Sequence, residues 1–173
     1  LAIGLSLFLM MIYVAFRFRM KLAVGAVVSL VHDVLFTVGA FAIFGFPFDL
    51  TVLAAVLALI GYSLNDTIVI FDRVRENFRK LRKADAIEVV DISLTETLRR
   101  TIMTVGTVLV VVVAMLWLGG PALRWFSVAM MIGLFAGTYS SIYIATSYAL
   151  MMGLDKEDFI EKPKSELVEE TFD

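Results

Sequence analysis

The sequence predicts an all-α membrane protein folded as a polytopic helical bundle, and three observations support this class. Hydrophobic residues make up 60% of the 173 residues, and the mean hydropathy is +0.90. Five apolar segments approach the roughly 20 residues with which a helix crosses a bilayer. The charged residues lie mainly between or after those segments, and the net charge of −2 implies no bulk nucleic-acid-binding surface.

The first three predicted spans are separated by short polar or turn-forming stretches. The first span covers residues 1–16, and the second covers residues 22–44. Gly45 and Pro47 then break the apolar pattern, as these residues do in turns. The third span covers residues 50–71. We therefore expect two closely spaced antiparallel helices around the Pro47 turn.

The second half of the chain contains the one long polar insertion. We predict that this insertion is a loop with a short amphipathic helix, which Ser93 and Glu96 begin as a capping box. The remaining predicted segments are the loop 72–100, the fourth span 101–118, the turn Gly119-Gly120-Pro121, the fifth span 126–152 and the acidic tail 155–173.

The basic residues predict the orientation of the bundle. Lys and Arg gather on the cytoplasmic side of membrane proteins, and every Lys and Arg here except Arg124 falls on one side of the predicted spans. The loop 72–100 and the tail are therefore expected in the cytoplasm. Because Leu1 then begins on the outer side and lies within an apolar run, we expect a fragment of a longer protein with an odd number of earlier spans.

Two carboxylates, Asp33 and Asp66, lie inside apolar spans. A charged group in hydrocarbon costs about 2.5–3.5 kcal/mol or more, so such residues face protein or water and are candidates for function. By helix rise, Asp66 lies roughly 10 Å from Arg73, and the depths of the two carboxylates differ by roughly 8 Å. Both residues are candidates for a proton relay.

Other polar residues surround these carboxylates in the sequence. Arg100 opens the fourth span and could supply a counter-charge, while the side chains near Asp66 could hold the waters of a proton path. The supporting polar residues are Tyr62, Ser63, Asn65, Thr67 and His32. A second interpretation stays open, in which neutral or paired aspartates only join helices through hydrogen bonds.

The last span carries a stripe of small residues at every fourth position. Its central members are Gly133, Gly137, Ser141 and Ala145. Small side chains let helices approach closely in membranes, so we predict a tight helix contact within this bundle or with a partner.

The sequence gives little support for an enzyme, a cofactor or a metal site. It has no Cys and a single His, so neither a thiol nucleophile nor a zinc-type ligand cluster is expected. An intramembrane aspartyl protease needs two carboxylates that share a proton. The different estimated depths of Asp33 and Asp66, and the lack of a Gly-x-Gly-Asp pattern, argue against that chemistry.

Several motifs together resemble one family. They are Val31-His32-Asp33-Val34-Leu35, Gly45-Phe46-Pro47-Phe48-Asp49-Leu50-Thr51, Ile60-Gly61-Tyr62-Ser63-Leu64-Asn65-Asp66-Thr67, Phe71-Asp72-Arg73-Val74-Arg75-Glu76-Asn77 and Leu94-Thr95-Glu96-Thr97-Leu98-Arg99-Arg100-Thr101-Ile102-Met103-Thr104. With these motifs the chain is similar to the SecF family of the bacterial and archaeal SecDF protein-export complex, within the resistance-nodulation-division superfamily.

This resemblance implies family helices 2–6, preceded in the family by a first helix and an outer domain. It also implies a translocase subunit in the bacterial or archaeal cytoplasmic membrane. Such a subunit would use the proton-motive force with SecD to assist polypeptide export through the Sec channel, without a cofactor. Asp66 matches the family's proton-relay carboxylate, Arg100 matches its partner, and Asp33 falls on a further polar motif. The alternatives are a proton-coupled lipid or drug transporter of the same superfamily and a structural membrane scaffold.

Overall fold

The computed structural model describes residues 4–5, 8–9, 12–13, 20–81, 83–155 and 158–159. These residues form helices and turns without any strand, which confirms the all-α class for this part of the chain. The elements are α2 (Met20–Phe44), α3 (Leu50–Lys80), α4 (Ala86–Leu118), α5 (Gly120–Tyr139), the π-helix η1 (Ser140–Ile144) and α6 (Ala145–Met151).

Four stretches of helix are long and apolar enough to cross a membrane within the described residues: α2, α3, α4 and the continuous segment 120–151. The predicted first span, 1–16, lies outside the described residues apart from the helical pairs 4–5, 8–9 and 12–13. Five spans therefore stay a prediction. The predicted tail, 155–173, lies outside them as well, except at 155 and 158–159.

The polar segment 72–100 is not the loop that the sequence predicted. The third helix continues to Lys80, and the fourth begins at Ala86. The expected capping box at Ser93 and Glu96 is also wrong, since both residues lie inside α4. The Ser93 hydroxyl donates to the carbonyl of Val89 one turn earlier, so it is satisfied within the helix and does not begin one.

The turns between helices follow from particular residues. Gly45 has φ +64°, a left-handed conformation that glycine adopts without strain. Asp49 caps α3 by accepting hydrogen bonds from the backbone N–H groups of Thr51 and Val52, both at 2.9 Å. At the other connection, Gly120 has φ +67°. The last helix begins there and not at residue 126, because Pro121 is well suited to the first turn of a helix.

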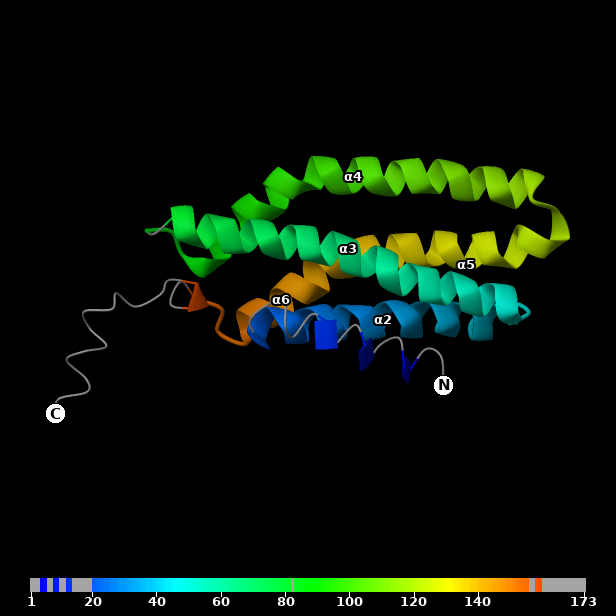
Figure 1. The fold of residues 1–173 in the computed structure, drawn as a ribbon, viewed down its shortest axis with the longest axis horizontal. Helices are drawn as coiled ribbons and strands as arrows, with labels where there is room; N and C mark the ends of the chain where they lie inside the picture. Colours follow the sequence, from blue (N-terminus) through cyan, green and yellow to red (C-terminus); the bar gives the residue numbers. More distant parts are fainter. Residues whose placement is uncertain are drawn as a thin grey trace.

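The helices pack along one another as an elongated bundle (Figure 1), with α3 in contact with α2, α4, α5 and η1. The buried apolar residues form two clusters. One contains Leu30, Phe71 and Phe78 and lies toward the polar connection, which is the segment 81–85 between α3 and α4. The other contains Phe41 and Leu134 and lies toward the Pro47 turn. Buried polar side chains lie close to where the clusters meet, so the bundle interior contains a polar layer.

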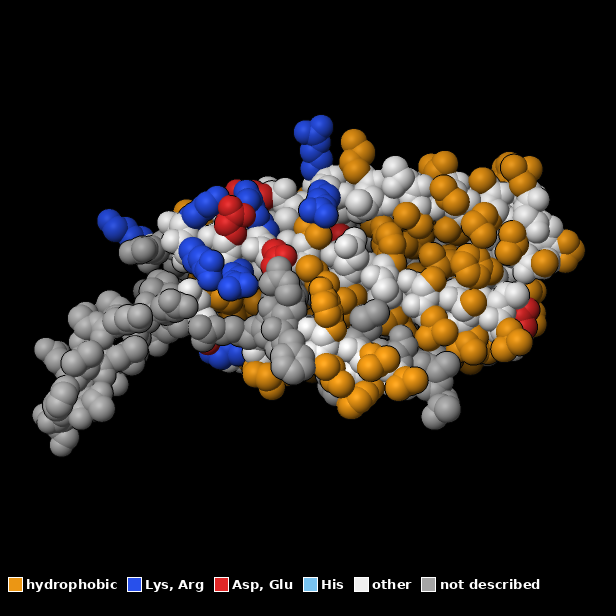
Figure 2. Space-filling model, in the orientation of Figure 1, with side chains coloured by type: hydrophobic (Ala, Val, Ile, Leu, Met, Phe, Trp, Pro, Cys, Tyr) orange, Lys and Arg blue, Asp and Glu red, His pale blue; other side chains and the backbone are white. Residues whose placement is uncertain are grey.

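The outer surface has one charged end and a largely apolar remainder. Figure 2 shows Lys and Arg side chains gathered at the end where α3 ends and α4 begins, while hydrophobic side chains cover much of the rest of this face. Exposed apolar residues include Val110, Trp117 and Leu118 of α4. A soluble protein rarely exposes so much apolar surface, and in a membrane protein this surface meets lipid or other apolar helices.

Candidate proton-relay site

Asp66 lies on the side of α3 that faces α4, and its side chain is buried with 6% exposure. Its Oδ1 accepts a hydrogen bond of 2.9 Å from the hydroxyl of Thr101. Its Oδ2 is buried and has no hydrogen-bond partner among the described residues. Buried polar atoms in native proteins almost always have a protein or water partner, and an exception calls for an explanation such as a catalytic role or a bound water.

Arg100 lies beside this carboxylate without contacting it. It is exposed and interacts electrostatically with Asp66, but no hydrogen bond or ion pair joins the two described side chains. The residue that does contact Asp66 is Thr101, which the sequence reasoning missed. The spacing of Thr97, Thr101 and Thr104 along one side of the helix was the available signal, because residues three and four apart share a face.

A cleft between α3 and α4 lies beside Asp66 and Arg100, on the side of the polar connection. It has a volume of about 510 Å³ and is lined by charged and polar side chains from both helices, including Asn65, Arg73, Glu96 and Arg100. Asn65 is exposed although it lies within the apolar part of α3. The cleft therefore offers a polar approach to the neighbourhood of Asp66 from the charged end of the bundle.

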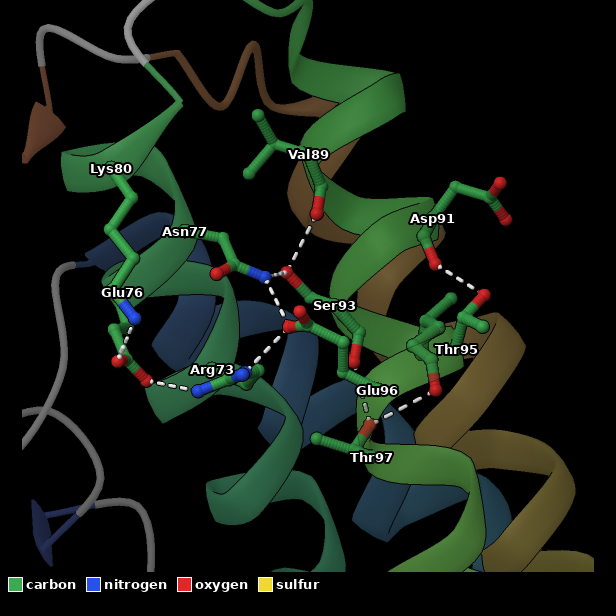
Figure 3. A network of polar contacts seen from close by, with 11 residues as sticks. Arg73, Glu76, Asn77, Lys80, Val89, Asp91, Ser93, Thr95, Glu96 and Thr97 are labelled. Atoms are coloured by element: carbon green, nitrogen blue, oxygen red, sulfur yellow. Dashed lines mark hydrogen bonds and ion pairs between the residues drawn. The ribbon is translucent and has the colours of Figure 1, made fainter.

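A network of polar contacts, part of which lines the cleft, holds the two helices together (Figure 3). The guanidinium of Arg73 donates from Nε to Glu96 and from Nη1 to Glu76, both at 2.6 Å. The buried Asn77 amide donates to Glu96 at 2.8 Å and to Ser93 at 3.0 Å. Hydrogen bonds to charged groups are among the stronger ones in proteins, so this network fixes α4 against α3 at their polar ends.

Asp33 belongs to a second polar group, on the sides of α2 and α3 that face the last span. The carboxylate is 4% exposed. Its Oδ2 accepts a 2.5 Å hydrogen bond from Ser63, and its Oδ1 lies 3.2 Å from Nδ1 of His32. Asp33 contacts Ser63, which precedes Asp66 by three residues on α3. The depths of the two carboxylates therefore differ by roughly 4.5 Å along α3. The difference in depth of roughly 8 Å expected from the sequence was too large.

The small-residue stripe of the last span packs inside the chain, against α2 and α3. A side chain at Gly133 would meet Leu59, and one at Gly137 would meet Ser63 and Asp33. Ser141 and the hydroxyl of Thr67 lie 2.9 Å apart, and the backbone of Ala145 contacts Gly25. In the described residues, the stripe thus lies at a close helix contact within this bundle.

The predicted supporting residues divide between the two groups. Ser63 and Thr67 face α2 and the π-helix, His32 pairs with Asp33, and Asn65 lines the cleft. Tyr62 alone among them accompanies Asp66 on the α4 side, where its buried hydroxyl has no well-formed hydrogen bond within the described part of the chain. Across the described residues, no group of three or more His, Asp or Glu side chains could hold a metal ion.

Comparison with known proteins shows the family of the chain. The family model for the C-terminal part of the protein-export membrane proteins SecD and SecF matches residues 1–155. The chain belongs to this family. The resemblance that its motifs indicated is thereby confirmed, and the family covers the whole described bundle up to the end of the last helix.

Individual relatives give the same result. The protein translocase subunit SecF of Vibrio alginolyticus is 50% identical over 157 residues, which are 91% of this chain and 50% of that protein. SecF of Pseudomonas aeruginosa is 53% identical over 160 residues, 92% of this chain and 52% of that protein. A crystal structure of SecDF in its super-membrane-facing form matches with a TM-score of 0.81 at 41% identity, over 85% of this chain and 20% of that one. The chain thus spans about half the length of these SecF proteins.

Proposed function

We propose that this chain is the membrane part of a protein translocase subunit that works with SecD and uses the proton-motive force to assist polypeptide export through the Sec channel. The names of its relatives support the export role. The observation that supports the proton relay is the buried Oδ2 of Asp66, which lacks a partner beside a polar cleft.

The bundle supports a two-state mechanism. When Asp66 is ionised, its negative charge attracts Arg100 across the edge of the cleft; when it is protonated, this attraction is lost. The Thr101 hydroxyl orients the carboxylate in either state. A charge change of this kind biases one helix arrangement over another. Movement of α4 relative to α3 would then be passed to the rest of the protein, where an outer domain meets the exported polypeptide.

The distribution of Lys and Arg supports an orientation for the chain in the cytoplasmic membrane of a bacterium or archaeon. The basic residues gather at the end formed by the tips of α3 and α4, and such residues favour the cytoplasmic side. The polar segment 72–100 and the tail would then lie in the cytoplasm. The cleft beside Asp66 would open toward the same side and release protons there.

The test uses the full-length subunit in its complex, with Asp66 replaced by Asn. Export of a secreted reporter is measured in cells, and proton flux is measured in membrane vesicles. We expect both to be lost in Asp66→Asn and kept in the control Glu88→Gln, which removes a carboxylate from the exposed first turn of α4. Normal export and normal flux in Asp66→Asn would reject the relay and favour a scaffold.

A second measurement in the same experiment tests the remaining alternative, a proton-coupled lipid or drug transporter. Lost proton flux with unchanged export, but with altered movement of lipid or drug, would favour a transporter of another substrate. Arg100→Lys and Arg100→Ala then test the counter-charge. We expect Lys to keep part of the flux, because it retains the charge without the guanidinium fork, and Ala to lose it. Wild-type flux in Arg100→Ala would remove Arg100 from the mechanism.

A further inference from the structure

Tyr62 lies one helical turn from Asp66 on the side of α3 that faces α4. Residues four apart on a helix lie one above the other on the same face. The Tyr62 hydroxyl is buried and meets full hydrogen-bond geometry with no partner among the described residues. The Thr104 side chain of α4 is a weak hydrogen-bond neighbour of this hydroxyl, and Asp66 interacts with it electrostatically. Within the part of the chain that the structure describes, Oη of Tyr62 and Oδ2 of Asp66 are thus two buried polar atoms one turn apart at one helix interface, and neither has a well-formed hydrogen bond.

The two residues have different surroundings. Asp66 adjoins the polar cleft through its neighbour Asn65 and through Arg100. Tyr62 packs against the apolar cluster that contains Leu59, Val112 and Leu134. Tyr62 therefore stands at the boundary between the carboxylate and the apolar half of the α3–α4 interface. A proton that approaches Asp66 from the end near Asp49 has to pass the level of Tyr62.

The other nearby hydroxyls are already engaged. Ser63 donates to Asp33, and Thr67 pairs with Ser141. The Thr104 hydroxyl donates to the carbonyls of Arg100 and Thr101 in its own helix. Of these groups, the phenol of Tyr62 is the one that both faces Asp66 and has its hydrogen uncommitted.

We propose that the Tyr62 hydroxyl is a relay group that delivers protons to Asp66, by way of one water held between Oη of Tyr62 and Oδ2 of Asp66. In this step a hydronium ion on the side near Asp49 gives one proton to Oη and becomes water, while Oη donates its own hydrogen to the bridging water. The water in turn protonates Oδ2. The phenol and the water end as they began, and one proton has been added to the carboxylate. A bridging water of this kind also supplies the partner that each buried atom lacks.

This inference rests on the proposed proton relay through Asp66, and the experiment keeps the two apart. The full-length subunit in its complex is reconstituted into vesicles, and proton flux is measured under an imposed pH gradient. Tyr62→Phe removes one hydroxyl and keeps the ring. The matched control is Tyr139→Phe, at an exposed tyrosine of α5. Thermal stability of each variant is measured alongside.

We expect Tyr62→Phe to lower the flux by roughly tenfold, because a positioned proton-transfer group accelerates such steps at least that strongly. Tyr139→Phe should keep the wild-type flux. Thermal stability of Tyr62→Phe should change little, since the hydroxyl loses only its weak contact with Thr104. The combination of slower flux with unchanged stability is not what a packing role would produce.

The contrary outcomes are distinct. If Tyr62→Phe carries protons like the wild type while Asp66→Asn does not, the phenol is no relay and the proposed function stands. If both variants carry protons normally, the relay through Asp66 is rejected, and the proposed role of Tyr62 is rejected as well. If Tyr62→Phe lowers flux and thermal stability together, and Asp66→Asn abolishes the flux, the effect is one of packing and overturns the inference.

Discussion

At the scale of single residues, the informative feature is how unequally the two buried carboxylates are satisfied. Asp33 has contacts at both oxygens, from Ser63 and His32, whereas Asp66 has one donor for two oxygens. A fully bonded carboxylate holds helices together, and a partly bonded one can still exchange a partner or a proton. This difference favours Asp66 as the relay and gives Asp33 the character of a helix-joining residue.

Asp49 gives a pH-dependent prediction outside the spans. Hydrogen bonds from the Thr51 side chain and the Val52 backbone lower the pKa of its carboxyl below the usual 3.8. A lowered pKa means that the ionised cap stabilises the folded state above about pH 3.8, and that this stabilisation is lost as the pH falls through the lowered value. We therefore expect Asp49→Ala to melt a few degrees lower at pH 7, and the difference to shrink below pH 3.8.

The measurement is thermal unfolding of the purified protein in detergent across this pH range. Asp49→Asn is the control, because Asn also caps helices well and cannot ionise. It should melt close to the wild type at pH 7. A melting difference between Asp49→Ala and the wild type that stays constant down to the most acid pH would contradict the role of the ionised cap.

The sequence allowed the candidate carboxylates to be predicted because an acidic residue in an apolar span is conspicuous. It did not show which of the neighbouring polar residues would contact them. Thr101 was missed because threonine is common in helices and its contact with Asp66 depends on how α4 packs against α3. Arg100, in contrast, was predicted from its charge and motif, and it lies near Asp66 without touching it.

At the scale of elements, α2 and the last span approach each other closely. Gly25 lies against the backbone carbonyl of Ala145, and the Ser29 hydroxyl donates to that of Ser140 at 2.9 Å. The last span forms a π-helix over Ser140–Ile144, at this contact. Local π-turns are frequent at functional sites, and this one lies beside the serines that bond to α2 and α3.

Gly25→Ala should therefore destabilise the bundle. A methyl group there collides with backbone, which cannot move aside like a flexible side chain, and overpacking of this kind costs about 1–3 kcal/mol. Gly39→Ala on the same helix is a matched control, because no atom lies within 4 Å of the added carbon. We expect a lower free energy of unfolding for Gly25→Ala alone, measured by denaturant titration in detergent. Equal stability of the two variants would show that this helix contact is looser than the structure indicates.

The helix ends show what the sequence could and could not predict at this scale. The apolar runs and the Pro47 turn marked the end of α2 at Phe44 and the start of α3 at Leu50 as they are found. The polar segment was predicted as a loop because charge was taken as the end of a helix. In the structure, contacts such as Arg73 with Glu96 and Asn77 with Ser93 join the two helical extensions. Such long-range partners are not visible in a local pattern.

At the scale of the whole molecule, α4 is the least covered of the four apolar spans in the described residues. The most apolar window of α4 is only 11% buried within the chain, compared with 50% for α3. Asn65, a polar residue within the membrane span of α3, is exposed beside the cleft. Polar side chains inside a membrane face protein or water and seldom face lipid. We therefore expect another protein, and not lipid, to cover this side, with SecD as the candidate in the proposed complex.

This expectation is tested with a photo-crosslinking amino acid in the full-length subunit. Placed at Val69, which lines the cleft, it should form an adduct with SecD. Placed at Phe36, an exposed apolar residue of α2, it should give none, because no exposed polar residue of the cleft lies on that helix. Adducts at Phe36 and not at Val69 would place the partner on the α2 side. In that case Oδ2 of Asp66 would lie near a surface exposed to water. The effect of the charge change at Asp66 would then have to reach SecD through α2 and the contacts of Asp33.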